Sequence, residues 1–307
     1  MSETTLRRLR PWLGTYVAIE ASSPDADRLS LAVEAAFSDV AAIHVAMSFQ
    51  SMASDLARLH RDAHRAPLRV GWHTWAVLEL AIHLARLSDG VFDPSIAPHL
   101  VRRGALPRPD GPEPDAGANW RDIELLDDQR VHFRCPLWLD LGGIAKGYAI
   151  DRAAETLLGH GVRRGIVNAG GDLRVFGDWA DDLPLQVRDP ADPAKSIPLG
   201  RVRDCAVATS GEFLLGRADS PGDLSPIVDP RRGPRPAQGR SVTVIAGSCA
   251  IADGLTKIVG LLGSAAQPLL THFAATAAIL EVPDTVHAAA DFWAAAGHAG
   301  PPGACHA

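Results

Sequence analysis

The chain has few aromatic residues and few cysteines, and it lacks a long apolar run. Phe, Trp and Tyr together make up 6% of its 307 residues. The four cysteines stand far apart with no C-x-x-C pair, which excludes a zinc knuckle and a dense disulfide framework and favours reduced thiols. Residues 1–21 contain no apolar run of signal-peptide length, and no later stretch reaches about 18 uninterrupted apolar residues. We therefore expect a cytoplasmic protein without a membrane segment.

A block of like charge is also absent. The chain has 30 Lys and Arg against 36 Asp and Glu, for a net charge of −6, and its basic residues are dispersed. This pattern argues against binding to nucleic acid or to an anionic membrane surface. The 47% of hydrophobic and 21% of charged residues are, by contrast, typical of a folded protein with a sizeable core.

Length and local composition bear on the domain organisation. At about 150 residues per domain, the chain has room for two domains or for one large α/β or α+β unit. We assign residues 1–285 to one domain, in which the Pro- and Gly-rich segment 102–119 is the candidate for a linker or an internal junction. Residues 286–307 form an Ala-rich tail that we expect to be frayed.

Hydrophobic periodicity predicts the order of helices and strands. Hairpin signals are frequent and strict strand–helix alternation is missing, so we expect an α+β fold with mixed, largely antiparallel sheets. The paired glycines 170 and 171 are the strongest of these hairpin signals. Helices are predicted at 30–47, 74–90, 143–161 and 251–262, and strands at 16–21, on both sides of the turn 127–129, up to Asp140, at 164–177 around the glycine turn, and at 184–189, 204–209 and 241–246.

The segment DLGGIAKGYAID, residues 140–151, carries the strongest indication of chemistry. A predicted strand ends at Asp140, two glycines free the backbone, and a helix begins with Lys146 in its first turns. Unpaired N–H groups at the helix start and the Lys146 charge would suit a phosphate group. A tight strand-to-helix turn with a surface lysine is the alternative. The Walker loop and the G-x-G-x-x-G motif are both absent.

Several shorter segments place polar groups where a ligand could reach them, although each also reads as a simple turn. They are Asn168 and Asp172 beside the glycine turn, Thr209 and Ser210 before Gly211, Asp93 before Pro94, and Asp229 before Pro230 with Arg231 and Arg232.

Two further pairs are spaced four residues apart. Asp253 and Lys257 lie one helical turn apart, so Asp253 is a helix-dipole partner, a metal ligand or half of a surface ion pair, and the spacing alone favours the ion pair. His60 and His64 match H-x-x-x-H, but Arg61 replaces the glutamate of a zinc-protease motif, so we interpret them as part of a solvated face.

Eight motifs follow one another in an order that is far more specific than any one of them. They are LGT (13–15), MSFQSMASDLARLH (47–60), VFDPSIAPHLV (91–101), DLGGIAKGYAID (140–151), VNAGGDLRVFG (167–177), ATSGEF (208–213), IVDPRRG (227–233) and ADGLTKIVGLLG (252–263). In this order they resemble the ApbE family, the FAD:protein FMN transferases, over about residues 8–281.

The resemblance implies an ApbE-like fold with flanking helices and a specific activity. In that family FAD is bound, its pyrophosphate is cleaved with Mg²⁺ as cofactor, and FMN is transferred to a Thr or Ser hydroxyl of a target flavoprotein. The resemblance further implies catalytic roles for Ser210 and Asp229, metal contacts at the Gly143 carbonyl, Asp253 and Thr256, and FAD contacts at Leu13, Val91, Phe92, Asp93, Asp140, Lys146, Thr209, Ser210, Gly211 and Ile227.

Three residues depart from the family pattern. Pro226 stands where the family has a histidine that assists the acceptor hydroxyl, and Arg232 replaces a threonine. Lys257 stands where the family has its metal-binding threonine. Because proline cannot exchange a proton, we expect transfer to be slow or absent, with FAD binding retained. An ammonium at position 257 would repel a divalent cation or could itself neutralise the pyrophosphate in its place, so we expect weakened metal dependence. The alternative is a family member that only binds flavin or hydrolyses FAD.

Overall fold

The computed structural model describes residues 3–192, 194–212, 224–235 and 237–282. These residues form two compact units. Unit 1 comprises the described parts of 1–40, 146–227 and 235–307, and unit 2 comprises 41–145 and 228–234. Helices and antiparallel sheets occur together, which confirms the α+β prediction. The predicted tail, 286–307, lies outside the described residues, and the single domain over 1–285 with its junction at 102–119 stays a prediction.

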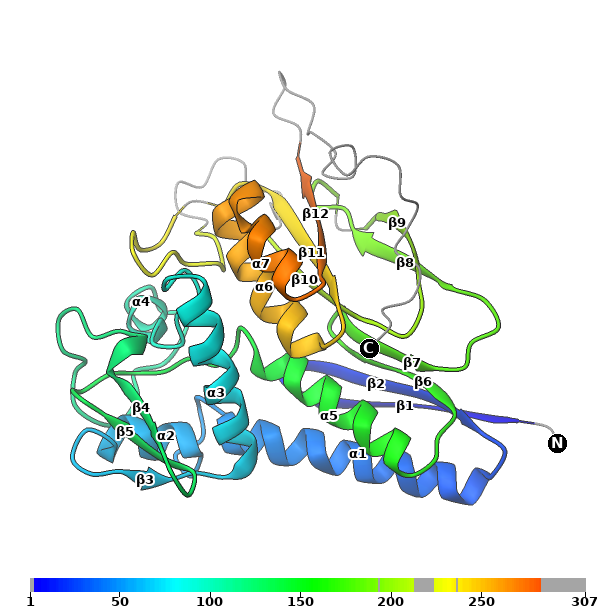
Figure 1. Cartoon of the computed structure of the whole chain (residues 1–307), viewed down its shortest axis with the longest axis horizontal. Coiled ribbons are helices and arrows are strands. Elements are labelled where there is room, and N and C mark those ends of the chain that lie inside the picture. The colour runs from blue at the N-terminus through cyan, green and yellow to red at the C-terminus, as the bar shows by residue number, and fades with distance from the viewer. Residues whose placement is uncertain (1–2, 193, 213–223, 236, 283–307) are drawn as a thin grey trace. The chain divides into compact units, whose positions relative to one another are not determined.

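Unit 1 is built on a sheet of seven strands in the order β1-β2-β6-β7-β10-β11-β12, in which every neighbouring pair is antiparallel (Figure 1). A separate hairpin, β8-β9, accompanies it. The strands are β1 (Thr4–Trp12), β2 (Thr15–Ser23), β6 (Arg164–Ala169), β7 (Asp172–Gly177), β8 (Leu183–Arg188), β9 (Ser196–Val202), β10 (Ala206–Gly211), β11 (Arg240–Ala246) and β12 (Thr276–Glu281).

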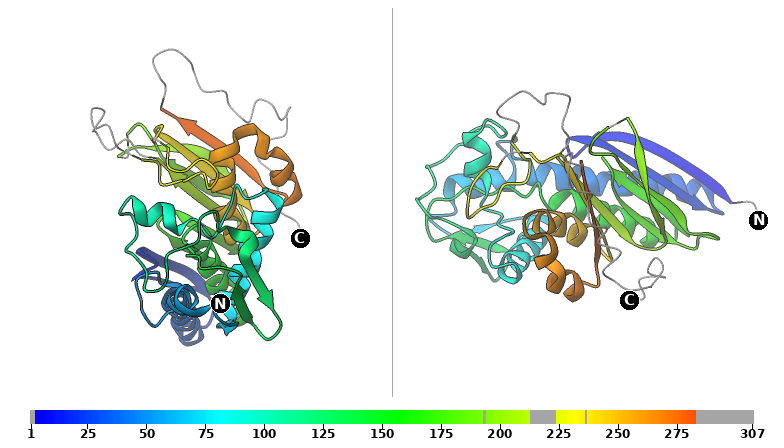
Figure 2. Two further views of the ribbon diagram at one scale, coloured as in Figure 1. Left: turned by 90° about the vertical axis from the view of Figure 1, so that its left-hand side faces the viewer. Right: turned by 90° about the horizontal axis from the view of Figure 1, so that it is seen from above.

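Helices cover one face of this sheet because alternate strand residues there are apolar. Val17 and Ile19 of β2 and Val167 of β6 are fully buried in a core shared with three helices, α1 (Ala26–Met47), α5 (Ala145–Gly159) and α6 (Cys249–Leu262). The sheet and these helices can be followed in Figures 1 and 2. On α6 the apolar residues recur at helical spacing, which confirms the predicted last helix. The short segments η2 (Gly263–Ala266) and α7 (Gln267–His272) follow α6.

The β8-β9 hairpin packs on the opposite face. Leu185 of β8 and Val202 of β9 form a second buried cluster with Val175 of β7 and Val207 of β10. Because adjacent residues of a strand point to opposite faces, Phe176 and Ala206 belong to the helix-covered core instead. The same alternation directs Asp172, at the start of β7, toward the helices.

Unit 2 contains short elements joined by long loops. Its sheet has the antiparallel order β3-β5-β4, and the predicted strands around the turn 127–129 are confirmed as β4 and β5. The elements are α2 (Asp55–Asp62), β3 (Leu68–Arg69), α3 (Trp72–Leu87), α4 (Ala97–Arg102), η1 (Trp120–Asp122), β4 (Ile123–Leu126) and β5 (Arg130–Phe133).

The predicted strand up to Asp140 was wrong, and several elements were not predicted, among them α2, β1, β9 and β12. Residues 134–140 belong to no strand, because their backbone groups bond to scattered partners such as the Pro94 carbonyl, which accepts from the Asp140 N–H at 2.8 Å. Strand β1 was missed, because Arg7, Arg8 and Arg10 interrupt its alternation. β1 is the edge strand of the sheet, and charged residues on an edge strand protect against pairing with other chains.

The interpretation of His60 as part of a solvated face was also wrong. Its side chain is 2% exposed, and its Nε2 lies 2.9 Å from the nitrogen and 3.1 Å from the carbonyl oxygen of Leu139. Burial lowers the pKa of His60 from 6.5 to about 4. The histidine thus anchors the extended segment before Asp140.

This histidine should make stability depend on pH. Between pH 6.5 and 4 the unfolded chain takes up a proton on His60 that the folded chain excludes, so the free energy of unfolding should fall as the pH falls. The full effect is about 3 kcal/mol. Urea unfolding at several pH values checks this, with His60→Gln, whose amide can still accept the Leu139 N–H, as the comparison. An equal slope in the variant and the unmodified protein would contradict the assignment.

Two helices are long and apolar enough to cross a membrane by length and composition alone, Ala26–Met47 and Cys249–His272. Both contribute buried residues to the core of unit 1. A core helix passes the same test as a membrane span, so this finding carries no membrane assignment.

Candidate functional site

The structure brings two predicted segments of unit 2 together. Val91 and Phe92 are buried, and Asp93 accepts hydrogen bonds from the Ser95 N–H at 2.8 Å and the Ser95 hydroxyl at 2.7 Å. Burial raises the pKa of Asp93 despite these bonds. Because the Asp140 N–H donates to Pro94, the two predicted flavin-contact segments are neighbours.

The turn after Asp140 leads directly into α5. The Asp140 carboxylate accepts the Gly142 N–H at 3.1 Å, and the Leu141 carbonyl accepts the Ala145 N–H at 2.8 Å. Gly143, the predicted carbonyl ligand, is half-buried within this turn. A Cβ at position 142 would lie 3.2 Å from an Asp140 carboxylate oxygen, so the Asp140 side chain lies close to the backbone of this turn.

Asp229 also belongs to unit 2, and its carboxylate is engaged by Arg231. It accepts from the Arg231 N–H at 2.9 Å and from the guanidinium Nε at 3.2 Å. Burial raises the pKa of Asp229, but the hydrogen bonds from Arg231 outweigh burial and the pKa is lowered overall. Asp229 is thus an ionised carboxylate that is already paired, which does not favour its predicted catalytic role as a proton acceptor.

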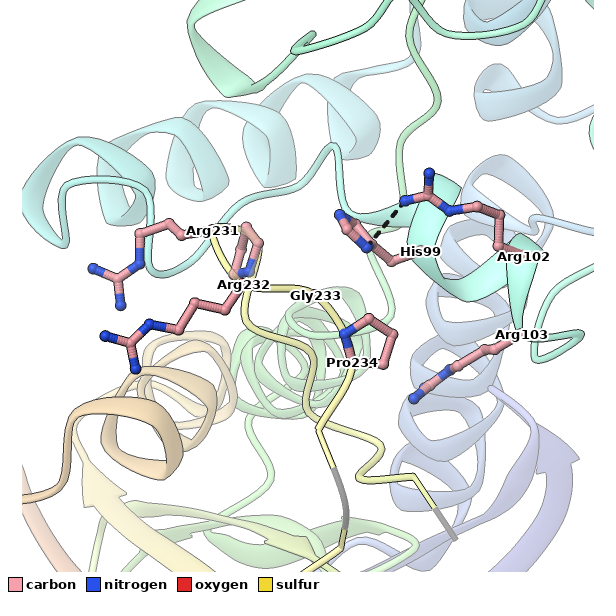
Figure 3. A pocket seen from close by; sticks show the side chains of 8 residues that line it. His99, Arg102, Arg103, Arg231, Arg232, Gly233 and Pro234 are labelled. Carbon is pink, nitrogen blue, oxygen red and sulfur yellow. Dashed lines mark hydrogen bonds between the residues drawn. The ribbon is translucent and has the colours of Figure 1, made fainter. Parts of the chain in front are cut away.

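Beside Asp229 lies a cavity of about 500 Å³ that the sequence did not predict. Figure 3 shows the Arg231 and Arg232 side chains extending away from the pair formed by His99 and Arg102, whose side chains meet at 3.1 Å. The guanidinium groups therefore do not converge on one point. The lining residues are His99, Arg102, Arg103, Pro230, Arg231, Arg232, Gly233 and Pro234.

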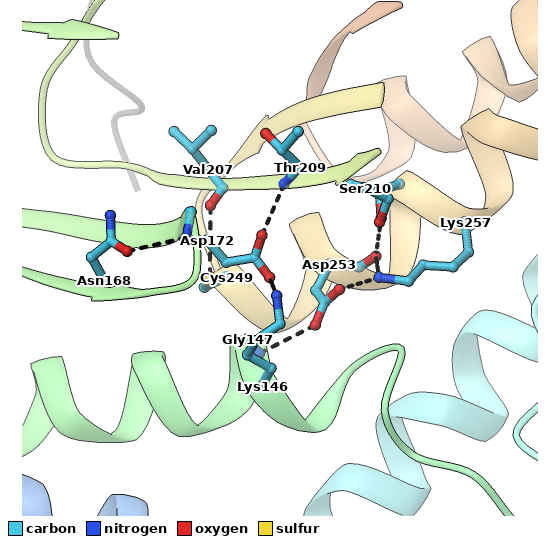
Figure 4. Close-up of polar contacts among 12 residues, drawn as sticks. Lys146, Gly147, Asn168, Asp172, Val207, Thr209, Ser210, Cys249, Asp253 and Lys257 are labelled. Carbon is cyan, nitrogen blue, oxygen red and sulfur yellow. Dashed lines mark hydrogen bonds and ion pairs between the residues drawn. The ribbon is translucent and has the colours of Figure 1, made fainter. Parts of the chain in front are cut away.

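A cluster of four charged residues lies in unit 1 and joins segments that are far apart in the sequence (Figure 4). Lys146, in the first turn of α5, forms an ion pair with Asp172 at the start of β7. Lys257 forms an ion pair with Asp253 one turn earlier on α6. The two carboxylates are each 1% exposed, whereas the lysine side chains are 27% and 24% exposed. The carboxylates are therefore buried, whereas the lysine side chains are partly exposed.

Backbone geometry fixes the Asp172 carboxylate in this place. The two-residue turn at Gly170 and Gly171, both with positive φ, closes the β6-β7 hairpin directly before Asp172. One carboxylate oxygen accepts the Thr209 N–H at 2.9 Å, and the other pairs with Lys146. Burial and the negative charge of Asp253 raise the pKa of Asp172, against the effect of both lysines.

The start of α5 is anchored on α6. The Gly147 N–H, which has no partner within its own helix, donates to the second carboxylate oxygen of Asp253 at 3.3 Å. A Cβ at position 147 would overlap the carbonyl group of Cys249 and lie 2.8 Å from the Cα of Ala250. Asp151 of α5 in turn accepts the N–H groups of Cys249 and Ala250 and so caps α6. The two helix starts therefore hold each other in place.

Each of the two lysines is held by a carboxylate. Burial alone lowers the pKa of Lys146, but the negative charges of Asp253 and Asp172 outweigh it, and the pKa is raised overall. Lys257 donates to the Asp253 carbonyl at 3.1 Å as well as to its carboxylate. The cluster thus presents two fixed ammonium groups.

Hydroxyl groups border this cluster. Ser210 of β10 shares a hydrogen bond of 2.7 Å with the hydroxyl of Thr256, which in turn donates to the Asp253 carbonyl at 2.7 Å. Thr209 directs its hydroxyl to Thr243, 3.0 Å away, on the other face of the sheet. Of the two predicted hydroxyls, only that of Ser210 points toward the helix-covered face.

The remaining predicted residues of unit 1 lie at turns or strand ends. Leu13 has a φ of 57° in the turn between β1 and β2, a strained conformation for a leucine, and its side chain packs on the helix-covered core. Gly211 ends β10, and the side chain of buried Ile227 lies against Gly260 of α6.

The oxygen atoms predicted to bind Mg²⁺ do not fit a divalent ion as they stand. The Lys257 ammonium already donates hydrogen bonds to the carboxylate and the carbonyl of Asp253. The Thr256 hydroxyl is hydrogen-bonded to the Ser210 hydroxyl and to the Asp253 carbonyl. Gly143 belongs to unit 2. Within the described residues, no group of three His, Cys, Asp or Glu could hold a metal ion either.

The sequence identified Lys146, Ser210 and Asp253 but missed the roles of Asp172 and Gly147. The sequence does indicate Asp172 as a candidate, because this acidic residue directly follows the glycine turn at 170 and 171. Nothing local marks Gly147, because the carbonyl group that excludes a side chain there lies 102 residues later in the chain, at Cys249.

Comparison with known proteins decides the family. The model of the ApbE family matches residues 13–280. The chain belongs to the ApbE family. This ApbE protein is 32% identical over 231 residues to the FAD:protein FMN transferase of Vibrio cholerae serotype O1, which covers 71% of this chain and 69% of that protein. It is 27% identical to the FAD:protein FMN transferase of Treponema pallidum, over 89% of this chain and 83% of that protein.

Solved structures agree with this assignment. The flavin transferase ApbE from Vibrio cholerae matches with a TM-score of 0.76 and 25% identity, over 92% of this chain and 95% of that one. The ApbE protein from Thermotoga maritima matches with a TM-score of 0.74 and 27% identity, over 90% of this chain and 94% of that one. The ApbE-like fold implied by the sequence motifs is therefore confirmed.

Proposed function

We propose that this ApbE protein transfers FMN from FAD to a Thr or Ser hydroxyl of an acceptor flavoprotein. Its curated relatives carry the name FAD:protein FMN transferase, and they match most of the chain. The observation in this chain that carries the proposal is the pair of partly exposed lysines, Lys146 and Lys257, each held by a buried carboxylate.

That arrangement suits the diphosphate of FAD. Four of the eight motifs, at 140–151, 167–177, 208–213 and 252–263, supply this one cluster. Because the lysines are positioned before a ligand arrives, their ammonium groups could donate hydrogen bonds to the phosphates without losing much side-chain freedom. Ser210 borders the cluster and is available to hydrogen-bond a phosphate oxygen.

The proposed reaction exchanges the phosphoanhydride bond of FAD for a phosphoester bond to the acceptor. The acceptor hydroxyl oxygen attacks the phosphorus atom on the FMN side of FAD, the bond to the AMP phosphate breaks, and AMP leaves with the negative charge. The proton of the hydroxyl passes to a base or to solvent. The positive charges of Lys146 and Lys257 would stabilise the charge that develops on the phosphates.

Mg²⁺ is the predicted cofactor of this reaction and would supply further charge neutralisation on the diphosphate when bound. The predicted oxygen ligands of unit 1, on Asp253 and Thr256, are hydrogen-bonded to Lys257 and Ser210, so a metal ion would have to displace these contacts in order to bind. The cytoplasmic location and an acceptor with a Thr or Ser flavinylation motif are likewise part of the proposal, and cell fractionation tests the first.

Incubation with FAD and an acceptor flavoprotein domain tests the function directly. The expected result is flavin fluorescence on the acceptor band of a denaturing gel, with release of AMP, and no fluorescence on an acceptor whose Thr or Ser is replaced by Ala. Release of FMN and AMP without labelling would identify a hydrolase instead. Unchanged FAD would identify a flavin-binding protein, and either outcome overturns the proposal.

The replacement Pro226→His should accelerate the transfer. Pro226 is exposed, whereas its neighbours are fixed, since Ser225 bonds to Glu212 at 2.6 Å and the Ile227 N–H bonds to Ser225 at 3.0 Å. An imidazole there adds a proton acceptor, for which we expect a gain of about 100-fold. The gain should disappear below about pH 6, where histidine is protonated. Pro226→Ala is the control, and an equal gain in that variant would contradict a role for the imidazole.

A further inference from the structure

The ammonium of Lys257 occupies the position of a cation bound to Asp253. Its Nζ donates to two oxygen atoms of that residue, the carboxylate Oδ1 and the main-chain carbonyl, the latter at 3.1 Å. Carboxylate and carbonyl oxygens are also the ligands that hard divalent cations prefer. A lysine four residues after an aspartate on a helix makes this contact within one turn, so no rearrangement is needed to form it.

The other oxygen atoms near Asp253 are also engaged. The Gly147 N–H donates to Oδ2 at 3.3 Å, and the fully buried hydroxyl of Thr256 shares a 2.7 Å hydrogen bond with Ser210. A divalent ion would have to displace the ammonium from both oxygen atoms of Asp253, and it would then bind within reach of the Lys257 charge, since Lys257 lies one turn further along the same helix.

Charge balance leads to the same conclusion. Asp172 and Asp253 supply two negative charges, and Lys146 and Lys257 supply two positive charges, so the cluster is already neutral. The carboxylates are buried, and only the lysine side chains are accessible from outside. An arriving anion therefore meets ammonium groups, and an arriving cation finds no free carboxylate.

We propose that Lys257 is a built-in cation that takes the place of a divalent metal ion at Asp253 and faces the diphosphate, so that this chain works without a bound metal. The catalytic part of this inference rests on the proposed function, whereas the metal-binding part does not. It assigns Lys257 a specific role in binding the phosphates, in addition to its contact with Asp253.

Binding of Mn²⁺ alone, followed by electron paramagnetic resonance without flavin, tests the metal-binding part. The unmodified protein should show no tight site, and Lys257→Thr should bind Mn²⁺ at least about 30-fold more tightly, because a repulsion of roughly 2 kcal/mol is removed. Lys195→Thr is the matched control, because Lys195 is 73% exposed and pairs only with Asp192 on the surface. Equal, tight Mn²⁺ binding by the unmodified protein and Lys257→Thr would overturn the inference.

A second variant guards against a folding defect. Lys257→Gln can still donate to Asp253 and should also bind Mn²⁺ more tightly than the unmodified protein, since it lacks the positive charge. Circular dichroism establishes that both variants are folded. If Lys257→Gln folds and binds Mn²⁺ no better than the unmodified protein, the charge of Lys257 does not exclude the metal and the inference fails.

Transfer assays with and without EDTA test the catalytic part. The unmodified protein should be insensitive to EDTA, whereas Lys257→Thr should require added Mg²⁺. Loss of all transfer by EDTA in the unmodified protein would overturn the inference. If no variant labels an acceptor under any condition, the proposed function fails, while the Mn²⁺ measurement still decides whether Lys257 excludes the metal.

Discussion

Replacing Gly147 by alanine is expected to destabilise the protein by about 3 kcal/mol or more, because the added methyl group has no space. It would overlap the carbonyl group of Cys249, which belongs to the backbone at the start of α6 and cannot rotate away. Helices α5 and α6 would have to separate, and the hydrogen bond from the Gly147 N–H to Asp253 would be lost. The measurement is urea unfolding followed by circular dichroism.

The matched control is Gly159→Ala at the other end of α5. No atom lies within 4 Å of a Cβ at that position, so the free energy of unfolding should change by less than about 0.5 kcal/mol. Flavin affinity should fall in the Gly147→Ala protein even where it remains folded, since Lys146 is the preceding residue. Equal unfolding midpoints for the two variants would show that α5 and α6 are not in close contact at Gly147.

Replacing Lys146 by methionine is expected to weaken both stability and flavin binding. The variant leaves Asp172 buried without its counter-charge, and breaking a buried pair in this way costs about 3–5 kcal/mol. Loss of a charge-assisted hydrogen bond to phosphate should lower FAD affinity by about 10- to 100-fold. Urea unfolding and isothermal titration with FAD measure the two effects separately.

The double variant Lys146→Met/Asp172→Asn separates the two roles of the lysine. The amide introduced at position 172 is uncharged and can still accept the Thr209 N–H, so much of the free energy of unfolding lost in Lys146→Met should return. FAD affinity should stay low, because the ammonium of Lys146 no longer faces the phosphates. Lys195→Met, on the surface, should change neither quantity. Recovery of FAD affinity in the double variant would mean that Lys146 only supports Asp172.

Features that depend on neighbours in the sequence were predicted correctly. The spacing of Leu255, Ile258 and Val259 predicted α6, and the glycines at 170 and 171 predicted the β6-β7 hairpin. The Asp253 to Lys257 ion pair also follows from helix geometry, although only the structure shows that its carboxylate is buried. The order of the eight motifs was sufficient to identify the family.

Features that depend on distant partners could not be predicted in this way. The apolar residues before Asp140 looked like a strand, but no strand lies beside them, and His60 and Pro94 take up their backbone N–H groups instead. His60 was assigned to a solvated face because its neighbours in the sequence are polar and basic, whereas its surroundings in the fold are not.

By itself, the sequence determined the four long helices α1, α3, α5 and α6, the β6-β7 hairpin and the residue types of the candidate site, because these follow from periodicity, turn chemistry and motif order. Only the tertiary structure decided that Lys146, Asp172, Asp253 and Lys257 form one neutral cluster with buried carboxylates and partly exposed lysine side chains. The physical reason is that helix and turn preferences act over a few residues, whereas burial and ion pairing depend on which segments pack together. Here the close contact of Gly147 with Cys249 joins segments about 100 residues apart, and no local pattern in the chain encodes it.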